Sequence, residues 1–474
     1  MSQFEVVVVF ADLDIAKAVS ANSFGPGSSV SADISNVLGE FGVALAPIFD
    51  EPAEIASPPA TFGGEEESLA PGADDQEMGR YFSAEVSSDA LEEFAAKMRD
   101  LPEVETAYAK PPTFNPVGPF QQAGLDEVSG EAPGEPGVIP QFSLRQTYLA
   151  PAPYGVGAAN AWSVPGGRGH GVNIIDIEGG WQLGHVDLQP NGGMAGGQQY
   201  DGVDWRNHGT AVMGEIIATH DEKGVLCIAP EARMAAVSHK GWGSARAINV
   251  AAAQLNPGDL LLLEMHRPGP RHNYAVREDQ SGYIAVEWWP DDFLAIRHAV
   301  RRGVIVIEAA GNGAENFDDP IFDRGECYFP AAWQNPFSPG IDSGAVIVGA
   351  GAPASGIHAP PRSRLDFSNF GQRVDCQGWG SEVTTTGYGD LYAGQNEDQW
   401  FTSTFSGTSS ASPIVAGVVA QLQGVARARS RLLGPMHVRQ LLRSIGEPQQ
   451  ASAAAPASER IGRQPNVEAM IATL

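Results

Sequence analysis

The segment around Ser409 carries side chains suited to nucleophilic catalysis. Ser406-Gly407-Thr408-Ser409 precedes an apolar stretch, 414–422, which predicts a helix. Gly407 allows the backbone to turn tightly before that helix. We therefore expect Ser409 at a helix N-terminus, where free N–H groups and the helix dipole favour negative charge. A serine nucleophile needs such a place because the carbonyl that it attacks becomes an oxyanion.

Three more residues supply the other groups that a serine nucleophile requires. His208 opens a predicted helix, and an imidazole there can act as general base. Asp176 ends an apolar strand, where a carboxylate can hold an imidazole in one tautomer. Asn312 follows another strand and has an amide N–H to donate to an oxyanion. Each residue alone is more often structural, so the prediction depends on all four standing at the ends of strands or helices.

The elements that carry these residues alternate between strands and helices. Buried strands are predicted at 172–175, 259–263, 304–307 and 345–348, and helices at 209–219, 245–255 and 292–302. This alternation predicts an α/β fold with a parallel sheet covered on both faces by helices. Ligands of such sheets bind at the carboxyl ends of the strands, and the four candidate residues fall at those ends.

Residues 1–112 have the pattern of a smaller α+β unit. Strands are predicted at 4–10, 43–49, 81–86 and 104–109, helices at 32–41 and 88–101, and a Gly- and Glu-rich loop at 62–77. Ser88 is the expected cap of the second helix, whose apolar residues share one face. The order β-α-β-β-α-β predicts a ferredoxin-like unit.

Residues 113–144 are rich in proline and glycine and separate the two patterned regions. Such a segment has too little apolar surface to offset the entropy of ordering, so it is predicted to be a linker. Exposed linkers are preferred sites of proteolysis, and we expect processing within residues 113–150. The catalytic unit is predicted to span residues 145–474.

Composition limits the partners and the compartment. The chain has 29 Lys and Arg against 57 Asp and Glu, a net charge of −28, which argues against nucleic acid and anionic membrane surfaces as partners. No apolar run is long enough to cross a bilayer. The first residues lack a basic n-region, which predicts a cytoplasmic protein, or a secreted one if an export signal is missing from this sequence. The three cysteines are widely spaced and predict neither a disulfide framework nor a zinc site.

Taken together, the catalytic segments resemble the subtilisin-like serine peptidases (subtilases). Ser-Gly-Thr-Ser-Ser-Ala-Ser-Pro at 406–413 is similar to the nucleophile motif of the family, His208-Gly209-Thr210 to its histidine motif, and Ala310-Gly311-Asn312 to its oxyanion segment. The order aspartate, histidine, serine is also that of subtilisin. The resemblance covers about residues 145–445, and residues 153–156 resemble the start of the mature enzyme. The N-terminal unit resembles the family's propeptide, most clearly over 81–109.

The resemblance implies a three-layer α/β/α peptidase domain and an acyl-enzyme mechanism. Ser409 is then the nucleophile, His208 the general base and Asp176 the residue that orients it, while Asn312 and the Ser409 N–H hold the oxyanion. Peptides or proteins are the implied substrates, and no cofactor is required for the chemistry. The N-terminal unit is the implied intramolecular chaperone and inhibitor of a self-processing zymogen.

Two departures from the family's pattern bear on specificity. Asp176 is followed by Ile177-Glu178, where the family has a small hydroxyl residue and glycine, so Glu178 is expected to bring a second carboxylate near the triad. The substrate-binding edge carries Glu264-Met265-His266 in place of Ser-Leu-Gly, and we expect these residues to contact substrate together with Gly311. Glu264 and Glu178 predict a preference for basic side chains. The alternative is that Glu264 is a solvated residue at the rim.

Calcium is a further implication of the resemblance. Asp187 and Asp221 fall where subtilisin has ligands of its tight calcium site, and carbonyls of Thr219, Lys223 and Val225 are expected to complete an oxygen shell.

Two other functions fit the same fold. A catalytically silent binding protein is expected to have lost one of the four catalytic residues, and all four are present. A narrow-specificity intracellular maturation protease shares the chemistry, and the altered substrate edge favours it.

Overall fold

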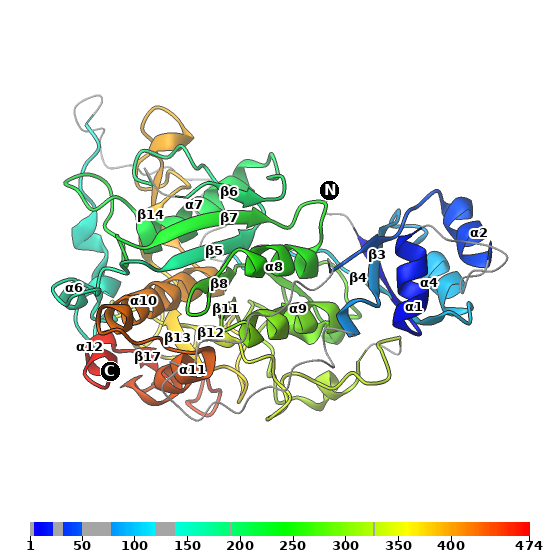
Figure 1. Cartoon of the computed structure of the whole chain (residues 1–474). Helices are drawn as coiled ribbons and strands as arrows, with labels where there is room; N and C mark the ends of the chain where they lie inside the picture. Colours follow the sequence, from blue (N-terminus) through cyan, green and yellow to red (C-terminus); the bar gives the residue numbers. More distant parts are fainter. Residues whose placement is uncertain (1–3, 22–31, 50–76, 119–137, 189–191, 326–327) are drawn as a thin grey trace.

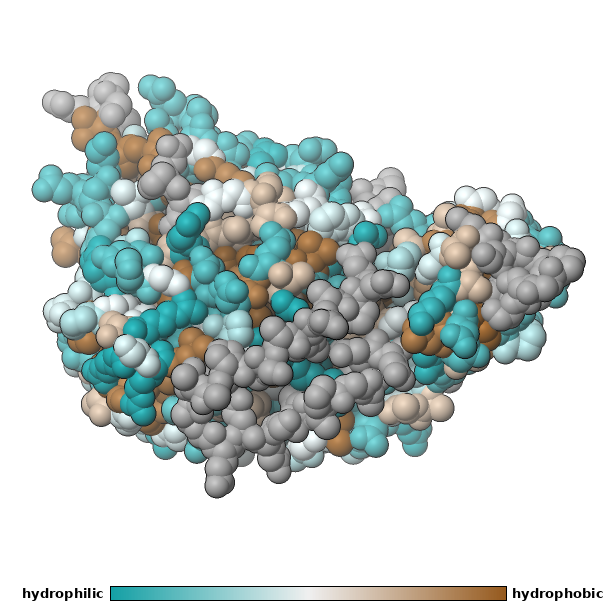
Figure 2. Space-filling view, in the orientation of Figure 1, coloured by the Kyte–Doolittle hydropathy of each residue, from teal (hydrophilic) through white to brown (hydrophobic). Residues whose placement is uncertain are grey.

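The structure is a computed structural model that describes residues 4–21, 32–49, 77–118, 138–188, 192–325 and 328–474. A small N-terminal unit stands beside a larger one that is built around a single sheet (Figure 1). On the face shown in Figure 2, hydrophilic residues are spread over both units, with smaller hydrophobic areas between them. Among the described helices, none is both long and apolar enough to cross a membrane.

The small unit is a four-stranded antiparallel sheet with helices packed on one face. The strands lie in the order β2-β3-β1-β4, and the ferredoxin-like arrangement predicted from the sequence is confirmed. Its elements are β1 (Glu5–Phe10), α1 (Leu13–Ser20), α2 (Ala32–Phe41), β2 (Ala46–Pro47), β3 (Tyr81–Glu85), α4 (Leu91–Arg99) and β4 (Val104–Lys110). Val6 and Val8 face these helices, whereas Val7 and Val9 face the larger unit, as the two-residue period of a strand requires.

The small unit differs from the sequence prediction in three places. Helix α1 was not predicted, and the strand expected at 43–49 is only two residues long. Helix α4 begins at Leu91 after Ala90, so Ser88 is not its cap. The loop predicted at 62–77 lies outside the described residues except for Glu77.

The larger unit contains a seven-stranded sheet in which every neighbouring pair is parallel. The strand order is β13-β12-β11-β8-β5-β7-β6. The strands are β5 (Asn173–Glu178), β6 (Met194–Gly196), β7 (Arg233–Ser238), β8 (Leu260–Leu263), β11 (Ile305–Ala309), β12 (Val346–Gly351) and β13 (Cys376–Trp379). The four predicted strands are confirmed as β5, β8, β11 and β12, with ends that differ by at most three residues.

Helices cover both faces of this sheet, which confirms the three-layer α/β/α fold. Alternate residues of β8 point to opposite faces: Leu260 and Leu262 pack with α7 and α10, and Leu261 and Leu263 with α8 and α9. The helices are α6 (Ala158–Ala161), α7 (Val203–Ile217), α8 (Ser244–Ala253), α9 (Pro290–Arg301), α10 (Thr408–Ala428), α11 (Pro435–Ser444) and α12 (Val467–Ile471). Helix α7 begins at Val203, so His208 lies in its second turn. The sequence had predicted His208 at the start of the helix, and that prediction is wrong.

Three short hairpins complete the larger unit. They pair β9 (His266–Pro268) with β10 (Tyr283–Ala285), β14 (Val383–Thr386) with β15 (Phe401–Phe405), and β16 (Gly446–Glu447) with β17 (Gln464–Pro465). The strands of the first two hairpins are largely buried, so these segments are part of the packed structure of the larger unit.

The free face of the small sheet packs on α8 and α9 of the larger unit. The ring of Tyr108 lies 5.1 Å from that of Phe329, and its hydroxyl donates to Asp291 at 3.0 Å. Lys110, at the end of β4, forms ion pairs with Asp291 and Asp292, and all three side chains are fully buried. A buried cation between two carboxylates fixes the position of β4, because a charge without its partner costs several kcal/mol in such a place.

Two of the three cysteines, Cys227 and Cys376, are buried and free. Both lie within the packed interior, where a thiol acts as a small apolar side chain. Cys327 lies outside the described residues.

Candidate active site

The imidazole of His208 is held by Glu178. Nδ1 of His208 lies 2.6 Å from Oε2 of Glu178, and both side chains are fully buried. Helix α7 reaches strand β5 because residue 209 is glycine: a Cβ there would lie 2.4 Å from the carbonyl oxygen of Gly180. The short hydrogen bond fixes the tautomer that carries its proton on Nδ1 and leaves Nε2 free to accept one.

Asp176 occupies a different place from the one predicted. Its Oδ2 accepts a hydrogen bond of 2.7 Å from Nε1 of Trp181, and no hydrogen bond from Asp176 to His208 is found among the described residues. Asp176 and Glu178 are two residues apart on β5 and face the same side, so a strand pattern cannot separate them. The expectation that Asp176 orients His208 is therefore corrected to Glu178.

A sequence signal for Glu178 was available. The family's motif has a small residue and glycine after its aspartate, and Gly179-Gly180 follow Glu178, whereas Ile177-Glu178 follow Asp176.

Ser409 lies in the first turn of α10, as predicted. Gly407 precedes the helix with φ 111°, a conformation that favours glycine, and the helix begins at Thr408. The carboxamide of Asn312 is bound to this turn, because its Oδ1 accepts hydrogen bonds of 3.0 Å from both the N–H and the hydroxyl of Thr408. Oγ of Ser409 and Nε2 of His208 are buried and make no hydrogen bond within the described structure.

In the predicted substrate edge, some residues pack with their side chains in the interior and His266 offers its main chain. Met265 is fully buried in the core of the larger unit, and Gly311 packs beneath His266 with φ 92°. Nδ1 of His266 accepts a hydrogen bond of 3.2 Å from the N–H of Asn312. The part of this edge that faces the cleft is the main chain of His266, which leaves its N–H and C=O for pairing with an extended peptide.

Glu264 points away from solvent. Its side chain is fully buried, and Oε1 accepts a hydrogen bond of 2.5 Å from the hydroxyl of Ser412, about one helical turn beyond the nucleophile on α10. The alternative that Glu264 is a solvated rim residue is therefore wrong. Because its carboxyl group lies under the helix that carries Ser409, it is not a group that meets a basic side chain at the surface.

Three buried carboxyl groups crowd this site and change its charge state. Burial first, and then the neighbouring carboxyl group, raise the pKa values of Asp176, Glu178 and Glu264 well above the usual range. Burial lowers the pKa of His208 to about 3. A buried site of this kind disfavours a charged imidazolium, so burial opposes protonation of His208.

The cleft is closed by residues 111–118, the crossing segment, which continues from β4. Phe114 and His266 exchange two backbone hydrogen bonds of 3.0 Å in an antiparallel bridge. The N–H of Gly118 then donates to the carbonyl of Ser406 at 3.1 Å. These two anchors carry the main chain between them over the turn before Ser409, which is fully buried. Residues 113–118, assigned to the linker from the sequence, are therefore ordered in the cleft, whereas residues 119–137 lie outside the described structure.

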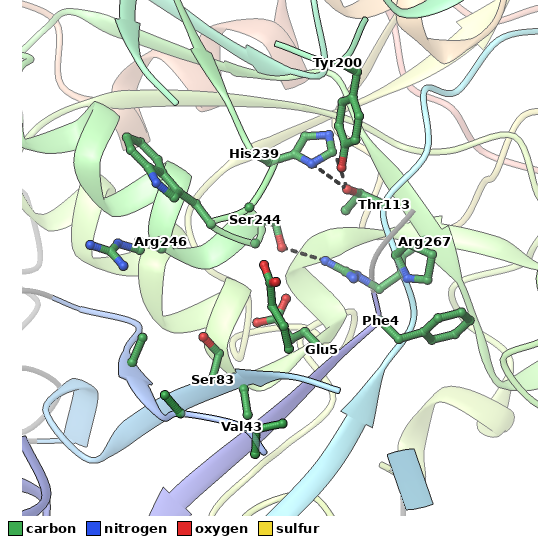
Figure 3. A pocket seen from close by; sticks show the side chains of 18 of the residues that line it. Phe4, Glu5, Val43, Ser83, Thr113, Tyr200, His239, Ser244, Arg246 and Arg267 are labelled. Carbon is green, nitrogen blue, oxygen red and sulfur yellow. Dashed lines mark hydrogen bonds between the residues drawn. The ribbon is translucent and has the colours of Figure 1, made fainter. Parts of the chain in front are cut away.

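A cavity of about 380 Å³ lies where the crossing segment enters the cleft, between the small sheet and the start of α8 (Figure 3). The hydroxyl of Thr113 lies 3.3 Å from Nδ1 of His239, and Arg267 donates to Ser244 at 2.6 Å. Glu5 reaches into the cavity from β1, and its burial raises its pKa to about 7 while Lys110 opposes the shift. The walls of the cavity therefore include polar and charged side chains, and both units contribute to them.

The two predicted calcium ligands lie in neighbouring loops. Asp187 is buried and accepts a hydrogen bond of 2.8 Å from the N–H of Val225. Its burial, with a further contribution from Asp221, raises its pKa to about 7. Among the described residues no group of three or more His, Cys, Asp or Glu is placed to hold a metal. A calcium ion here would therefore depend on main-chain oxygens beside these two carboxylates.

Comparison with known proteins agrees with this architecture. A profile of the subtilase family matches residues 169–453, more than half of the chain. The intracellular serine protease of Paenibacillus polymyxa is 27% identical over 273 residues, which are 55% of this chain and 69% of that protein. Subtilisin DY of Bacillus licheniformis is 26% identical over 275 residues, which are 56% of this chain and 83% of subtilisin DY.

Among solved structures, fervidolysin from Fervidobacterium pennivorans, a keratinolytic enzyme related to subtilisin, aligns with a TM-score of 0.53 at 15% identity. The alignment covers 99% of this chain and 61% of the fervidolysin chain, so this chain spans less than two thirds of that protein. At that identity the likeness concerns the fold. The profile match over the catalytic segments and the identity to the two proteases establish more, and this chain belongs to the subtilase family of serine peptidases.

Proposed function

We propose that this protein is a serine endopeptidase whose catalytic triad is Glu178, His208 and Ser409. The observation that carries the proposal is the 2.6 Å hydrogen bond from His208 to Glu178 in a buried site that ends at the first turn of α10. The proposal replaces Asp176 by Glu178 as the acid of the triad and keeps the predicted roles of His208, Ser409 and Asn312.

The proposed reaction follows the acyl-enzyme route. Oγ of Ser409 attacks the scissile carbonyl as Nε2 of His208 removes its proton, and the carboxylate of Glu178 stabilises the imidazolium that forms. Nδ2 of Asn312 and the N–H of Ser409 hold the oxyanion. His208 then returns the proton to the leaving amine, and water hydrolyses the serine ester by the same steps in reverse.

We further propose that the N-terminal unit is an intramolecular inhibitor. The crossing segment supports this role because it pairs with the main chain of His266 and passes over the turn before Ser409. Removal of this segment admits water to the three carboxyl groups and to His208, which lowers the cost of the imidazolium. Processing within residues 113–150 would be the step that begins this release.

Labelling of Ser409 tests the proposed activity. We expect a fluorophosphonate probe to modify Ser409 in the processed protein, and the same preparation to hydrolyse casein, because both reactions require a serine activated by His208. The measurement is the modified peptide by mass spectrometry together with the rate of casein cleavage, and Ser409→Ala is the control for both. N-terminal sequencing of the active protein, compared with Ser409→Ala, identifies the processing bond. A properly folded, processed protein that neither reacts nor cleaves would instead be a silent binding protein.

Calcium removal tests the proposed metal site at Asp187 and Asp221. Burial raises the pKa of Asp187, and a cation beside it would stabilise the charged carboxylate. A calcium concentration about 100 times the dissociation constant would stabilise the fold by about 2.7 kcal/mol, so EDTA should lower the melting temperature by about 3–4 °C. Asp187→Asn should abolish this response, and the control Asp201→Asn, at an exposed position, should preserve it. Equal melting temperatures with and without EDTA would remove calcium from the proposal.

A further inference from the structure

Gln280 links the oxyanion asparagine to the peptide chain in the cleft. Its Oε1 accepts a hydrogen bond of 3.2 Å from Nδ2 of Asn312, and its Nε2 donates one of 3.2 Å to the main-chain carbonyl of Asn115 in the crossing segment. Both polar atoms of the Gln280 side chain therefore form hydrogen bonds, one with Asn312 and one with the main chain of the crossing segment.

The first contact completes the fixing of Asn312. Its Oδ1 is already held by Thr408, so without Gln280 the carboxamide would be anchored at one end only. An oxyanion donor gains most of its effect when it is aimed before the reaction begins, because no reorganisation is then needed in the transition state. The Gln280 oxygen supplies the second anchor and sets the direction of the Nδ2 group.

The second contact recognises peptide backbone and not a side chain. The acceptor is the carbonyl oxygen of Asn115, one residue beyond the Phe114 bridge to His266. A group that binds a main-chain carbonyl acts on substrates of many sequences, and it adds a contact to the peptide beyond the pairing with His266.

The backbone at Gln280 is held in a conformation that is uncommon for a side-chain-bearing residue. Its φ is 55°, and turn hydrogen bonds join its N–H to Arg277 and its carbonyl to Tyr283, at 3.2 and 3.1 Å. Positive φ at a residue other than glycine is strained and persists where the surroundings enforce it. This turn leads directly into β10, so the hairpin that begins at His266 delivers Gln280 to the cleft.

We propose that Gln280 is a positioning residue of the peptidase site, orienting Asn312 through Oε1 and binding a substrate main-chain carbonyl through Nε2. The inference rests on the proposed peptidase function and on the crossing segment marking the path of substrate. It assigns a role in the reaction to the β9–β10 hairpin.

The test compares kcat and KM for a fluorogenic peptide cleaved by the processed full-length protein and by Q280M, which keeps the shape of the side chain and removes both polar atoms. Loss of one hydrogen bond corresponds to about a 3- to 10-fold effect. We expect kcat to fall by that factor because Asn312 is no longer aimed, and KM to rise by that factor because the carbonyl contact is lost. The exposed neighbour Glu278 provides the control variant E278Q, which should match the parent in both constants.

A second arm places Q280M in an N312L background. If Gln280 acts on kcat through Asn312, Q280M should leave kcat of N312L unchanged and still raise KM, a pattern that a merely structural loss of fold would not produce. Should Q280M fail to fold, as judged by its melting temperature, Q280N replaces it, because its shorter side chain cannot span both partners.

The outcomes separate the two proposals. Equal constants for Q280M and E278Q, or the same fall in kcat with and without Asn312, overturn the role of Gln280 while leaving the peptidase assignment intact. A folded, processed parent that cleaves nothing and does not react at Ser409 overturns the proposed function, and the role of Gln280 with it.

Discussion

Glu178→Gln should lower kcat by about 10⁴-fold, whereas Asp176→Asn should lower it by less than about tenfold. The glutamine that replaces Glu178 has the same size but no charge, so the imidazolium at His208 loses its partner and the Nδ1 tautomer is no longer enforced. In Asp176→Asn, the new amide oxygen can still accept the hydrogen bond from Trp181, which preserves the local packing. The measurement is kcat for peptide hydrolysis by the processed protein, with Ser409→Ala as the floor.

The pair of variants distinguishes the two carboxylates directly. A large loss in Asp176→Asn together with a small one in Glu178→Gln would restore Asp176 as the acid of the triad. Comparable losses in both would indicate that the two carboxyl groups act as one unit and share the charge that His208 requires.

Asp176→Asn also has an expected effect on stability. Burial raises the pKa of Asp176, so the native protein binds a proton there that the unfolded chain releases as the pH rises above about 4. The stabilising contribution of this group is therefore full below about pH 4 and is lost as the pH rises toward its native pKa. The asparagine side chain does not titrate and has no such dependence. The variant should therefore melt at a higher temperature than the parent at about pH 8, with the difference shrinking at about pH 5.

Lys110→Met should shift the protein toward its open form by about 10²- to 10³-fold. The substitution leaves Asp291 buried without its cation, whereas Asp292 keeps its ion pair of 3.3 Å with Arg267, and removal of one partner from a buried ion pair costs about 3–5 kcal/mol. Lys110 ends β4 directly before the crossing segment, so the cost falls on the contact that holds this segment in the cleft. We expect faster labelling of Ser409 by fluorophosphonate in the unprocessed full-length protein.

The small unit offers a matched control for this prediction. Lys97 on α4 forms ion pairs with Glu40 and Glu93, but these side chains are partly exposed, and solvent screens such pairs so that they contribute little to stability. Lys97→Met should therefore leave the labelling rate close to that of the parent. Adding Asp291→Asn to Lys110→Met should recover part of the closed state, because it removes a bare carboxylate. If Lys110→Met and Lys97→Met label at the same rate, the buried ion pairs do not hold the cleft closed.

The sequence predicted the order of layers better than the surroundings of the site. Runs of β-branched and leucine residues identified β5, β8, β11 and β12, because strands buried on both faces need apolar side chains at every position. Residues 266–291 carried no comparable pattern, since a hairpin joined by a long turn has neither helical nor strand period. The sequence pattern therefore gave no sign of Gln280, although its side chain is hydrogen-bonded to Asn312, the proposed oxyanion residue.

Within the proposed catalytic site, the sequence by itself predicted the residues proposed as nucleophile, base and oxyanion donor. Ser409, His208 and Asn312 each stand in a local sequence motif, although His208 lies in the second turn of α7 and not at its start. The acid was decided by tertiary structure, because Asp176 and Glu178 share one face of β5 and differ only in what packs above them. Asp176 accepts a hydrogen bond from Trp181. Gly209 lets α7 approach closely, so that His208 forms its hydrogen bond with Glu178. A one-dimensional pattern records which face a side chain occupies, but only the packing of a second element selects between two neighbours on that face.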